Sequence, residues 1–199
     1  LQRLCETNAK QTPGYGADDD CRQAHALIAQ LCGMPEAGVH FFVGGTQVNL
    51  TVIAAALRPF EGVLSADTGH INVHETGAIE ATGHKVLALP ARDGKLTAEQ
   101  VRAACLAHNG DATHEHMVRP AMVYISQPTE LGTLYTKSEL THLRAVTEEF
   151  GLRLYIDGAR MAYALAADSE VDMPFLARHC DAFTLGGTKC GALFGEALI

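Results

Sequence analysis

Leu152–Arg160 reads LRLYIDGAR, an apolar run that ends directly in an acidic residue. The run over 152–156 predicts a buried strand, with Asp157 immediately after it. A carboxylate in such a place is costly unless a cation or hydrogen-bond donors satisfy it. The stretch therefore indicates a binding site at the end of a strand, and the alternative is an internal ion pair between Asp157 and Arg160.

Similar apolar runs recur along the chain and predict the rest of a sheet. Strands are expected at about 39–43, 62–65, 85–89, 121–126, 152–156, 182–186 and 195–199. Most are continuous apolar runs, which are typical of strands buried on both faces. Apolar residues at helical spacing predict helices at about 19–32, 46–57, 97–108 and 137–150. Strands that alternate with helices predict an α/β fold with a mainly parallel sheet.

Short motifs predict where several of these helices begin and end. Thr97 with Gln100 has the spacing of a capping box, and Thr136 with Glu139 repeats it. In each box the hydroxyl and the longer side chain can satisfy unpaired N–H groups. Gly33 suits the C-terminal cap of the first helix.

Two further segments carry expectations about burial. The first helix should present one apolar face to the core, formed by Cys21, Ala24, Leu27, Ile28 and Leu31. The polar, histidine-rich segment 108–119 predicts a surface loop.

The composition excludes several classes of protein. A chain of 199 residues that is 47% apolar suits one sizeable domain with a hydrophobic core. No apolar stretch approaches the roughly 20 residues that cross a bilayer, and no signal-peptide pattern is visible. The net charge is −8 with lysine and arginine scattered, which argues against a nucleic-acid partner.

The six cysteines show no CxxC pair and no zinc-like spacing. We interpret them as reduced thiols of a cytoplasmic protein, with Cys21, Cys32 and Cys105 as small side chains at helical core positions. The chain begins at Leu1 and ends in the apolar run 197–199, so we expect it to be a fragment of a longer polypeptide.

A glycine-rich turn, Gly44-Gly45-Thr46-Gln47, lies between a predicted strand and a predicted helix. Free N–H groups and the helix dipole at such a place favour a phosphate, and Thr46 adds a hydroxyl donor. The alternative is an ordinary glycine turn without a ligand.

A histidine ends the stretch Ser65–His70, which reads SADTGH and follows a short predicted strand. His70 should therefore lie near the carboxyl end of a strand, where α/β sheets place ligands. An imidazole there can stack on a flat heteroaromatic ring or move a proton. The alternative is a solvated or structurally hydrogen-bonded histidine.

A lysine follows the last but one predicted strand in Phe183–Gly191, which reads FTLGGTKCG. Lys189 in this glycine-rich turn suits a nucleophilic amine that a carbonyl cofactor captures. The alternative is a surface lysine in a flexible turn.

Together these four segments fit pyridoxal 5′-phosphate, which needs a phosphate cradle, a stacking ring, a carboxylate for its ring nitrogen and an amine for its aldehyde. A metal site built from His114 and His116 is a weaker alternative, because no further ligand has a predictable position. We therefore expect no metal.

The order of the motifs GGTQ, GHINVHETGA, YIDGARMAYAL and GGTKCGALFGEALI resembles the threonine aldolase and β-eliminating lyase group of fold-type-I pyridoxal phosphate enzymes. Tyr15–Asp18 also resembles the YGxD motif of that group. The resemblance runs from about residue 15 to the end. It implies a mostly parallel seven-stranded sheet flanked by helices, followed by a small C-terminal domain. We expect residues 1–199 to be the cofactor-binding large domain, without the small one.

The resemblance also assigns roles to individual residues. Gly45 and Thr46 match the phosphate-binding turn, and His70 matches the histidine that stacks on the pyridine ring. Asp157 matches the partner of the ring nitrogen, and Lys189 matches the Schiff-base lysine. His70 and Lys189 are the expected catalytic residues.

Arg160 matches the arginine near the cofactor's phenolic oxygen and the substrate carboxylate. The implied reaction is retro-aldol cleavage of a β-hydroxy-α-amino acid such as threonine to glycine and an aldehyde. One alternative is β-elimination with the same cofactor, and another is a truncated, non-catalytic cofactor-binding domain. Members of the group are homodimers or homotetramers, so we expect either for this protein.

Overall fold

The computed structural model describes residues 2–167 and 170–199. In this part of the chain, strands form at the seven places where apolar runs predict them. They are β1 (His40–Phe42), β2 (Glu61–Ala66), β3 (Val86–Leu89), β4 (Arg119–Ser126), β5 (Arg153–Asp157), β6 (Ala182–Gly186) and β7 (Glu196–Leu198). Predicted and observed ends agree to within two residues.

The strands form one sheet in the order β1-β7-β6-β5-β4-β2-β3. The pairs β2–β3, β2–β4, β4–β5 and β5–β6 are parallel. Strand β7 is antiparallel to both of its neighbours. The prediction of a mostly parallel seven-stranded α/β sheet is therefore confirmed.

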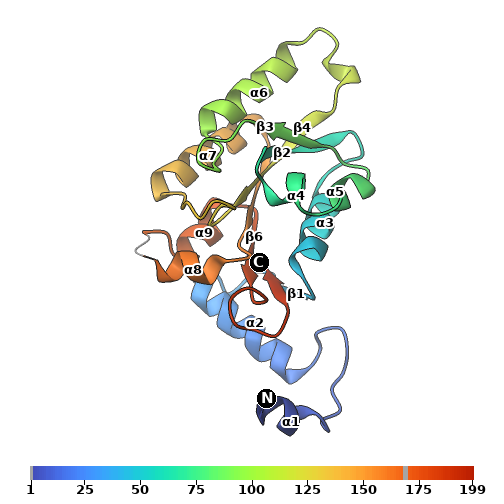
Figure 1. Cartoon of the computed structure of the whole chain (residues 1–199), viewed down its shortest axis with the longest axis vertical. Helices are drawn as coiled ribbons and strands as arrows, with labels where there is room; N and C mark the ends of the chain where they lie inside the picture. Colours follow the sequence, from blue (N-terminus) through green and yellow to red (C-terminus); the bar gives the residue numbers. More distant parts are fainter. Residues whose placement is uncertain (1, 168–169) are drawn as a thin grey trace.

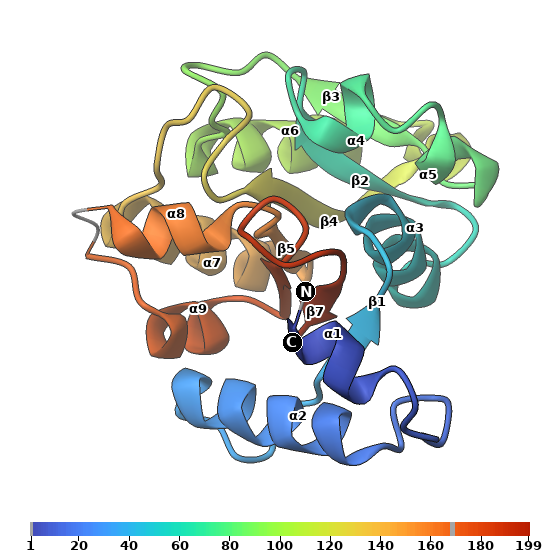
Figure 2. The same ribbon diagram turned by 60° about the horizontal axis from the view of Figure 1, so that its bottom comes forward.

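Helices cover both faces of this sheet (Figures 1 and 2). Among the described residues they are α1 (Gln2–Thr7), α2 (Asp19–Cys32), α3 (Gly45–Ala56), α4 (His70–Val73), α5 (Ala78–Ala81), α6 (Ala98–Gly110), the 3₁₀ helix η1 (His114–His116), α7 (Lys137–Phe150), α8 (Met161–Ala166) and α9 (Met173–His179). Of these helices, none is both long and apolar enough to cross a bilayer.

Two apolar clusters fill the layers on either side of the sheet. One holds the buried side chains of α3, α4 and α5, and the other holds those of α2, α6, α7, α8 and α9. Strand β5 shows the division, because Leu154 and Ile156 enter the second cluster while Tyr155 enters the first. Successive side chains of a strand point to opposite faces, so a continuous apolar run is needed when both faces are covered.

The helix ends follow the predicted chemistry. Thr97 and Gln100 form a complete capping box at the start of α6, and Thr136 and Glu139 form another at α7. Gly33 adopts a left-handed conformation at the end of α2, with φ of 63°, and its N–H bonds back into the helix. Helix α6 continues to Gly110, two residues past its predicted end.

The predicted apolar face of α2 is wrong in part. The structure buries Ile28, Ala29 and Cys32, but Leu27 and Leu31 are 56% and 59% exposed. The helix lies across the β1–β7 side of the molecule (Figure 2), so only a narrow stripe of it meets the core.

Three other expectations need correction. Cys32 and Cys105 are buried as expected, whereas Cys21 is only half-buried. The predicted loop 108–119 contains the end of α6 and the short helix η1. Helices α1, α4, α5, α8 and α9 were not predicted, because each has seven residues or fewer and so too little sequence to show a helical period.

Glycines allow the ends of β5 and β6 to approach each other closely. A Cβ atom placed on Gly158 would lie 1.9 Å from the carbonyl oxygen of Thr184. The N–H of Gly158 donates to the Thr184 hydroxyl at 2.7 Å, and the N–H of Gly186 donates to the Gly158 carbonyl at 2.9 Å. This contact aligns the segments that follow the two strands.

Gly158→Ala is therefore expected to lower the free energy of unfolding by about 1–3 kcal/mol, because the added methyl group has no space. Gly110→Ala is the matched control, since a Cβ there meets nothing within 4 Å. It should leave stability unchanged or raise it by up to about 1 kcal/mol. Urea unfolding measures both, and equal stabilities of the two variants would contradict the packing argument.

Candidate active site

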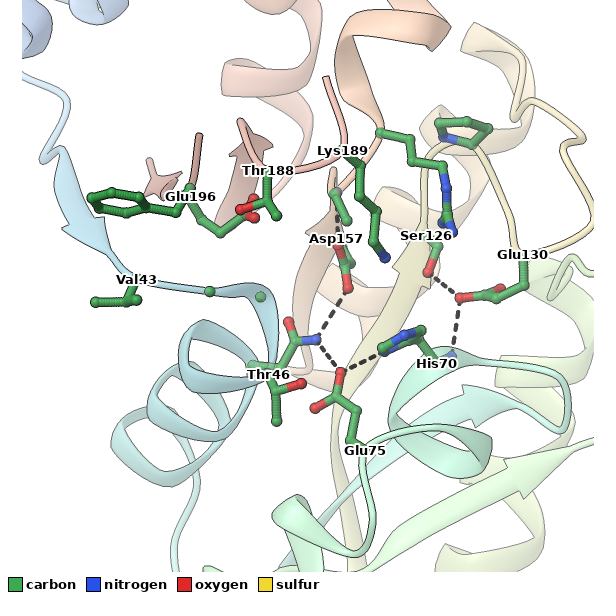
Figure 3. Close-up of a pocket in the computed structure, with 17 residues that line it drawn as sticks. Val43, Thr46, His70, Glu75, Ser126, Glu130, Asp157, Thr188, Lys189 and Glu196 are labelled. Carbon is green, nitrogen blue, oxygen red and sulfur yellow. Dashed lines mark hydrogen bonds and ion pairs between the residues drawn. The ribbon is translucent and has the colours of Figure 1, made fainter. Parts of the chain in front are cut away.

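A cavity of about 330 Å³ lies at the carboxyl ends of the parallel strands, a volume within the usual range of small-molecule sites. Segments from β1–α3, β2–α4, β4, β5 and β6–β7 surround it. All six residues predicted to form the site line this one cavity: Gly45, Thr46, His70, Asp157, Arg160 and Lys189. Figure 3 shows the labelled side chains of this group converging from different elements.

Asp157, the last residue of β5, is only 6% exposed. Its Oδ2 accepts hydrogen bonds from the Tyr124 hydroxyl at 2.6 Å and from Asn49 Nδ2 at 3.1 Å. Its Oδ1 accepts from the N–H of Ala159 at 2.8 Å. Within the described chain no ion pair joins Asp157 to Arg160, so hydrogen-bond donors satisfy this carboxylate instead of the arginine.

Two buried tyrosines fix the donors around Asp157. Burial raises the pKa of Tyr124 and of Tyr155 well above the ordinary phenol value, and the Asp157 charge raises both further. Both phenols therefore stay protonated and donate. The Tyr155 hydroxyl donates to Asn49 Oδ1 at 2.7 Å, which turns the Asn49 amide so that its NH₂ faces the carboxylates.

The same NH₂ group reaches a second buried acid. Asn49 Nδ2 donates to Glu75 Oε1 at 2.6 Å, and that oxygen lies 2.7 Å from Nδ1 of His70. The Glu75 side chain is fully buried, whereas that of His70 is 27% exposed and lines the cavity. The hydrogen bond to Glu75 raises the pKa of His70, although burial opposes it. The contact with Glu75 thus fixes the orientation of the His70 ring.

The turn before α3 has the form of an anion cradle. Gly44 is the N-cap of this 12-residue helix, and the first-turn N–H groups of Gly45 and Thr46 have no partner within the helix. A Cβ atom on Gly44 or Gly45 would meet nothing within 4 Å, and both residues line the cavity. The backbone is therefore open to a bound anion such as a phosphate.

Lys189 is exposed, and two hydrogen bonds hold the turn that carries it. The N–H of Gly187 donates to the Gly195 carbonyl at 3.0 Å, and the Tyr163 hydroxyl donates to the Lys189 carbonyl at 3.2 Å. In Figure 3 the amine points into the cavity, toward Asp157 and His70. Lys189 forms no ion pair with any other described residue.

Arg160 occupies the N-cap position of α8, makes no side-chain capping hydrogen bond there, and is half-buried. Its guanidinium group lines the cavity without an acidic partner in the described residues. An unpaired guanidinium beside a cavity is suited to bind a carboxylate with two parallel hydrogen bonds.

Several residues of the site were not predicted as site residues. Asn49 lies on a helix and Tyr124 within a strand, and neither differs in sequence from an ordinary core position. Glu130 could have been noticed as an acid four residues after a predicted strand, and Glu75 as an acid five residues after His70. Glu196 of β7 is 6% exposed, its Oε2 is buried without a partner among the described residues, and burial raises its pKa.

The segment with His114 and His116 forms the short helix η1. In η1 the Nδ1 of His114 lies 2.9 Å from the Asp111 carbonyl. Nowhere in the described ranges do three or more His, Cys, Asp or Glu side chains form a group that could hold a metal ion.

Comparison with known proteins identifies the family to which the chain belongs. A profile described as "Beta-eliminating lyase" matches residues 4–196. The low specificity L-threonine aldolase of Pseudomonas aeruginosa is 32% identical over 200 residues, which cover 98% of this chain and 56% of that protein. The chain thus spans just over half the length of this relative.

Solved structures agree with this. The threonine aldolase of Leishmania major has 48% identity and a TM-score of 0.94, over 100% of this chain and 57% of that one. A putative L-allo-threonine aldolase of Listeria monocytogenes has a TM-score of 0.75 at 20% identity, over 98% of this chain and 53% of that one, so it supports the fold alone.

We expect the pKa of His70 to lie above the ordinary value of about 6.5 and to fall in Glu75→Gln, because burial then acts without the carboxylate. An NMR titration of the imidazole measures this, and Glu80→Gln on the exposed side of α5 is the control. A His70 pKa that is the same in both variants would disprove the coupling.

The same coupling predicts how stability depends on pH. A pKa that is raised in the folded state stabilises the protein fully below the pKa of the unfolded state, and the effect is lost as the pH rises through the folded value. The destabilisation caused by Glu75→Gln should therefore be larger in acid than in alkaline buffer.

Proposed function

The chain belongs to the β-eliminating lyase family, and from this we propose that it is the cofactor-binding part of a pyridoxal 5′-phosphate-dependent carbon–carbon lyase. The proposed reaction cleaves a β-hydroxy-α-amino acid such as threonine to glycine and an aldehyde. One observation carries the proposal: the amine of Lys189, the carboxylate of Asp157 and the ring of His70 all border a single cavity. The relatives named threonine aldolases support the choice of substrate.

The described residues fit this cofactor. The turn at Gly44–Thr46 presents unpaired N–H groups and no side chain at its two glycines, which suits the phosphate group. Lys189 provides the amine for the aldehyde group.

Pyridoxal phosphate supplies an electron sink for the carbanion that forms when a bond at Cα breaks. The chain's own residues prepare the site for this. The Asp157 carboxylate, fixed by Tyr124, Asn49 and the backbone, would hold a proton on the cofactor's ring nitrogen. The His70 imidazole would stack on the pyridine ring, in an orientation set by its contact with Glu75. Arg160 binds the substrate carboxylate and so determines which bond at Cα is oriented for cleavage.

β-Elimination is the second candidate, because the matching family profile is described by that reaction. Both reactions use the same lysine and cofactor, and contacts to the substrate distinguish them. A non-catalytic cofactor-binding domain is the third candidate.

We further propose that residues 1–199 form the large cofactor-binding domain, and that the protein works in the cytoplasm as a homodimer or homotetramer. Exposed apolar side chains support association. Val43 and Phe194 both line the cavity, at 69% and 68% exposure, and an apolar rim of this kind is typical of a surface that another chain covers. All six cysteines are free, which is typical of a reducing compartment.

Lys189→Ala should abolish covalent attachment of the cofactor. Borohydride reduction followed by peptide mass spectrometry should find one cofactor on the Lys189 peptide of the wild-type protein and none in the variant. Lys137→Ala removes a lysine of α7 outside the cavity and should retain the adduct. An adduct that persists in Lys189→Ala would disprove the assignment.

The products distinguish the candidate reactions. Threonine should yield glycine and acetaldehyde in equal amounts, with no formation of a 2-oxo acid and ammonia. Chromatography of the amino acid and enzymatic detection of the aldehyde measure both. A 2-oxo acid with ammonia would favour elimination, whereas a reduced cofactor adduct without turnover would favour the non-catalytic domain.

A further inference from the structure

Four carboxylates line the cavity in the described part of the chain, and Glu130 is the one that is not buried. Glu75, Asp157 and Glu196 are 3%, 6% and 6% exposed. Both oxygens of Asp157 accept hydrogen bonds, and Glu75 lies behind His70. Glu130 is therefore the acidic group best placed to meet a substrate.

The two oxygens of Glu130 have different surroundings. Its Oε1 accepts the backbone N–H of His70 at 3.0 Å and the hydroxyl of Ser126 at 2.6 Å. Its Oε2 makes no hydrogen bond with any described residue, yet it is not one of the atoms buried without a partner. One oxygen thus fixes the carboxylate at the end of β4, and the other remains available to a bound molecule (Figure 3).

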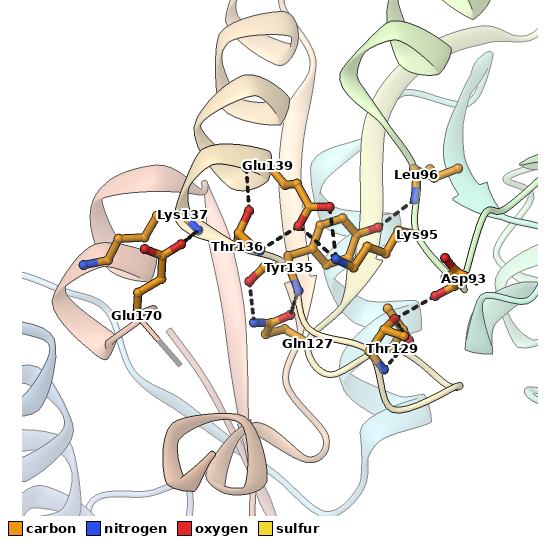
Figure 4. Close-up of polar contacts among 11 residues, drawn as sticks. Asp93, Lys95, Leu96, Gln127, Thr129, Tyr135, Thr136, Lys137, Glu139 and Glu170 are labelled. Atoms are coloured by element: carbon orange, nitrogen blue, oxygen red, sulfur yellow. Dashed lines mark hydrogen bonds and ion pairs between the residues drawn. The ribbon is translucent and has the colours of Figure 1, made fainter. Parts of the chain in front are cut away.

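The loop that carries Glu130 is braced at its base (Figure 4). The fully buried Gln127 side chain accepts the N–H of Tyr135 at 2.9 Å and donates to the Tyr135 carbonyl at 3.2 Å. The Thr129 and Thr133 hydroxyls lie 2.7 Å apart, and the Thr133 hydroxyl donates to the Asp93 carbonyl at 2.7 Å. A catalytic group needs such support, because small displacements greatly reduce its effect.

We propose that Glu130 is the general base that accepts the proton of the substrate's β-hydroxyl group during carbon–carbon cleavage. This inference rests on the proposed function and deepens it by naming the base. The O–H electron pair becomes the second bond of the aldehyde carbonyl, the Cα–Cβ bond breaks, and its electron pair remains on Cα. Cα then takes up a proton from solvent to give glycine, and Glu130 returns its proton to solvent.

His70 is less suited to this role. Its Nδ1 is held by Glu75, and that hydrogen bond raises its pKa, which favours the protonated ring. A protonated imidazole has no lone pair to accept a proton. The Glu130 carboxylate accepts one directly, and it lies on the β4 loop, separate from the groups that hold the ring nitrogen and the phosphate.

Glu130→Gln tests the proposal, because the amide oxygen can still accept the hydrogen bonds from His70 and Ser126 while the basic oxygen is replaced. Glu115→Gln, an exposed position in η1, is the charge-matched control. The protein is produced from its complete reading frame. Three quantities are measured: the cofactor mass fixed on Lys189 by borohydride, the affinity for glycine from the cofactor's absorbance, and the rate of aldehyde release from threonine.

In Glu130→Gln we expect the adduct to be retained and the glycine affinity to stay within about twofold of wild type, while aldehyde release falls by roughly 10²- to 10⁴-fold. Glycine has no β-hydroxyl group, so its binding does not need the base. Glu130→Asp should recover part of the lost rate. Glu115→Gln should match wild type in all three measurements.

Two results would overturn the proposal. One is aldehyde release in Glu130→Gln within about threefold of wild type. The other is a loss of adduct or glycine affinity as large as the loss of rate, which would make Glu130 a structural residue of the β4 loop. A wild-type protein that forms no adduct on Lys189 would instead reject the proposed function itself, so the two failures are distinguishable.

Discussion

The buried carboxylate of Asp157 is the constraint on which the cavity depends. A charge at 6% exposure is tolerated only when donors surround it, and three elements provide them: Asn49 from α3, Tyr124 from β4 and the backbone after β5. Because these donors come from different parts of the fold, satisfying one charge also fixes the distance between α3 and the middle of the sheet. The glycine turn before α3 and the imidazole of His70 take their positions from that arrangement.

The shared direction of the parallel strands explains why segments far apart in the sequence meet at the cavity. Parallel strands place their carboxyl ends at the same edge of the sheet, so the residues after β2, β4, β5 and β6 gather there whatever their separation in sequence. Strand β7 reverses direction and returns the chain to β1, which brings Glu196 and the start of α3 to the same edge. The residues that line the cavity therefore gather at the edge of the sheet where the parallel strands end.

Much of the fold and of the candidate site could be predicted from the sequence, because buried strands appear as apolar runs and cavity-lining residues follow them directly. The run before Asp157 and the glycines before Lys189 are of this kind. Asn49 and Tyr124 could not be predicted, because their function arises from contacts with Asp157, 108 and 33 residues away. The exposure of Leu27 was missed for a related reason: helical spacing defines a face, but the neighbouring elements determine how much of it is covered.

The shared amide of Asn49 also constrains how this protein can evolve. One NH₂ group separates two buried acids, so a mutation that removes it leaves Glu75 and Asp157 facing each other without a donor between them. Replacing Asn49 should therefore cost less in a background where Glu75 has already lost its charge. We therefore expect these two positions to covary among homologues, with mutational paths between lineages that pass through the acid first.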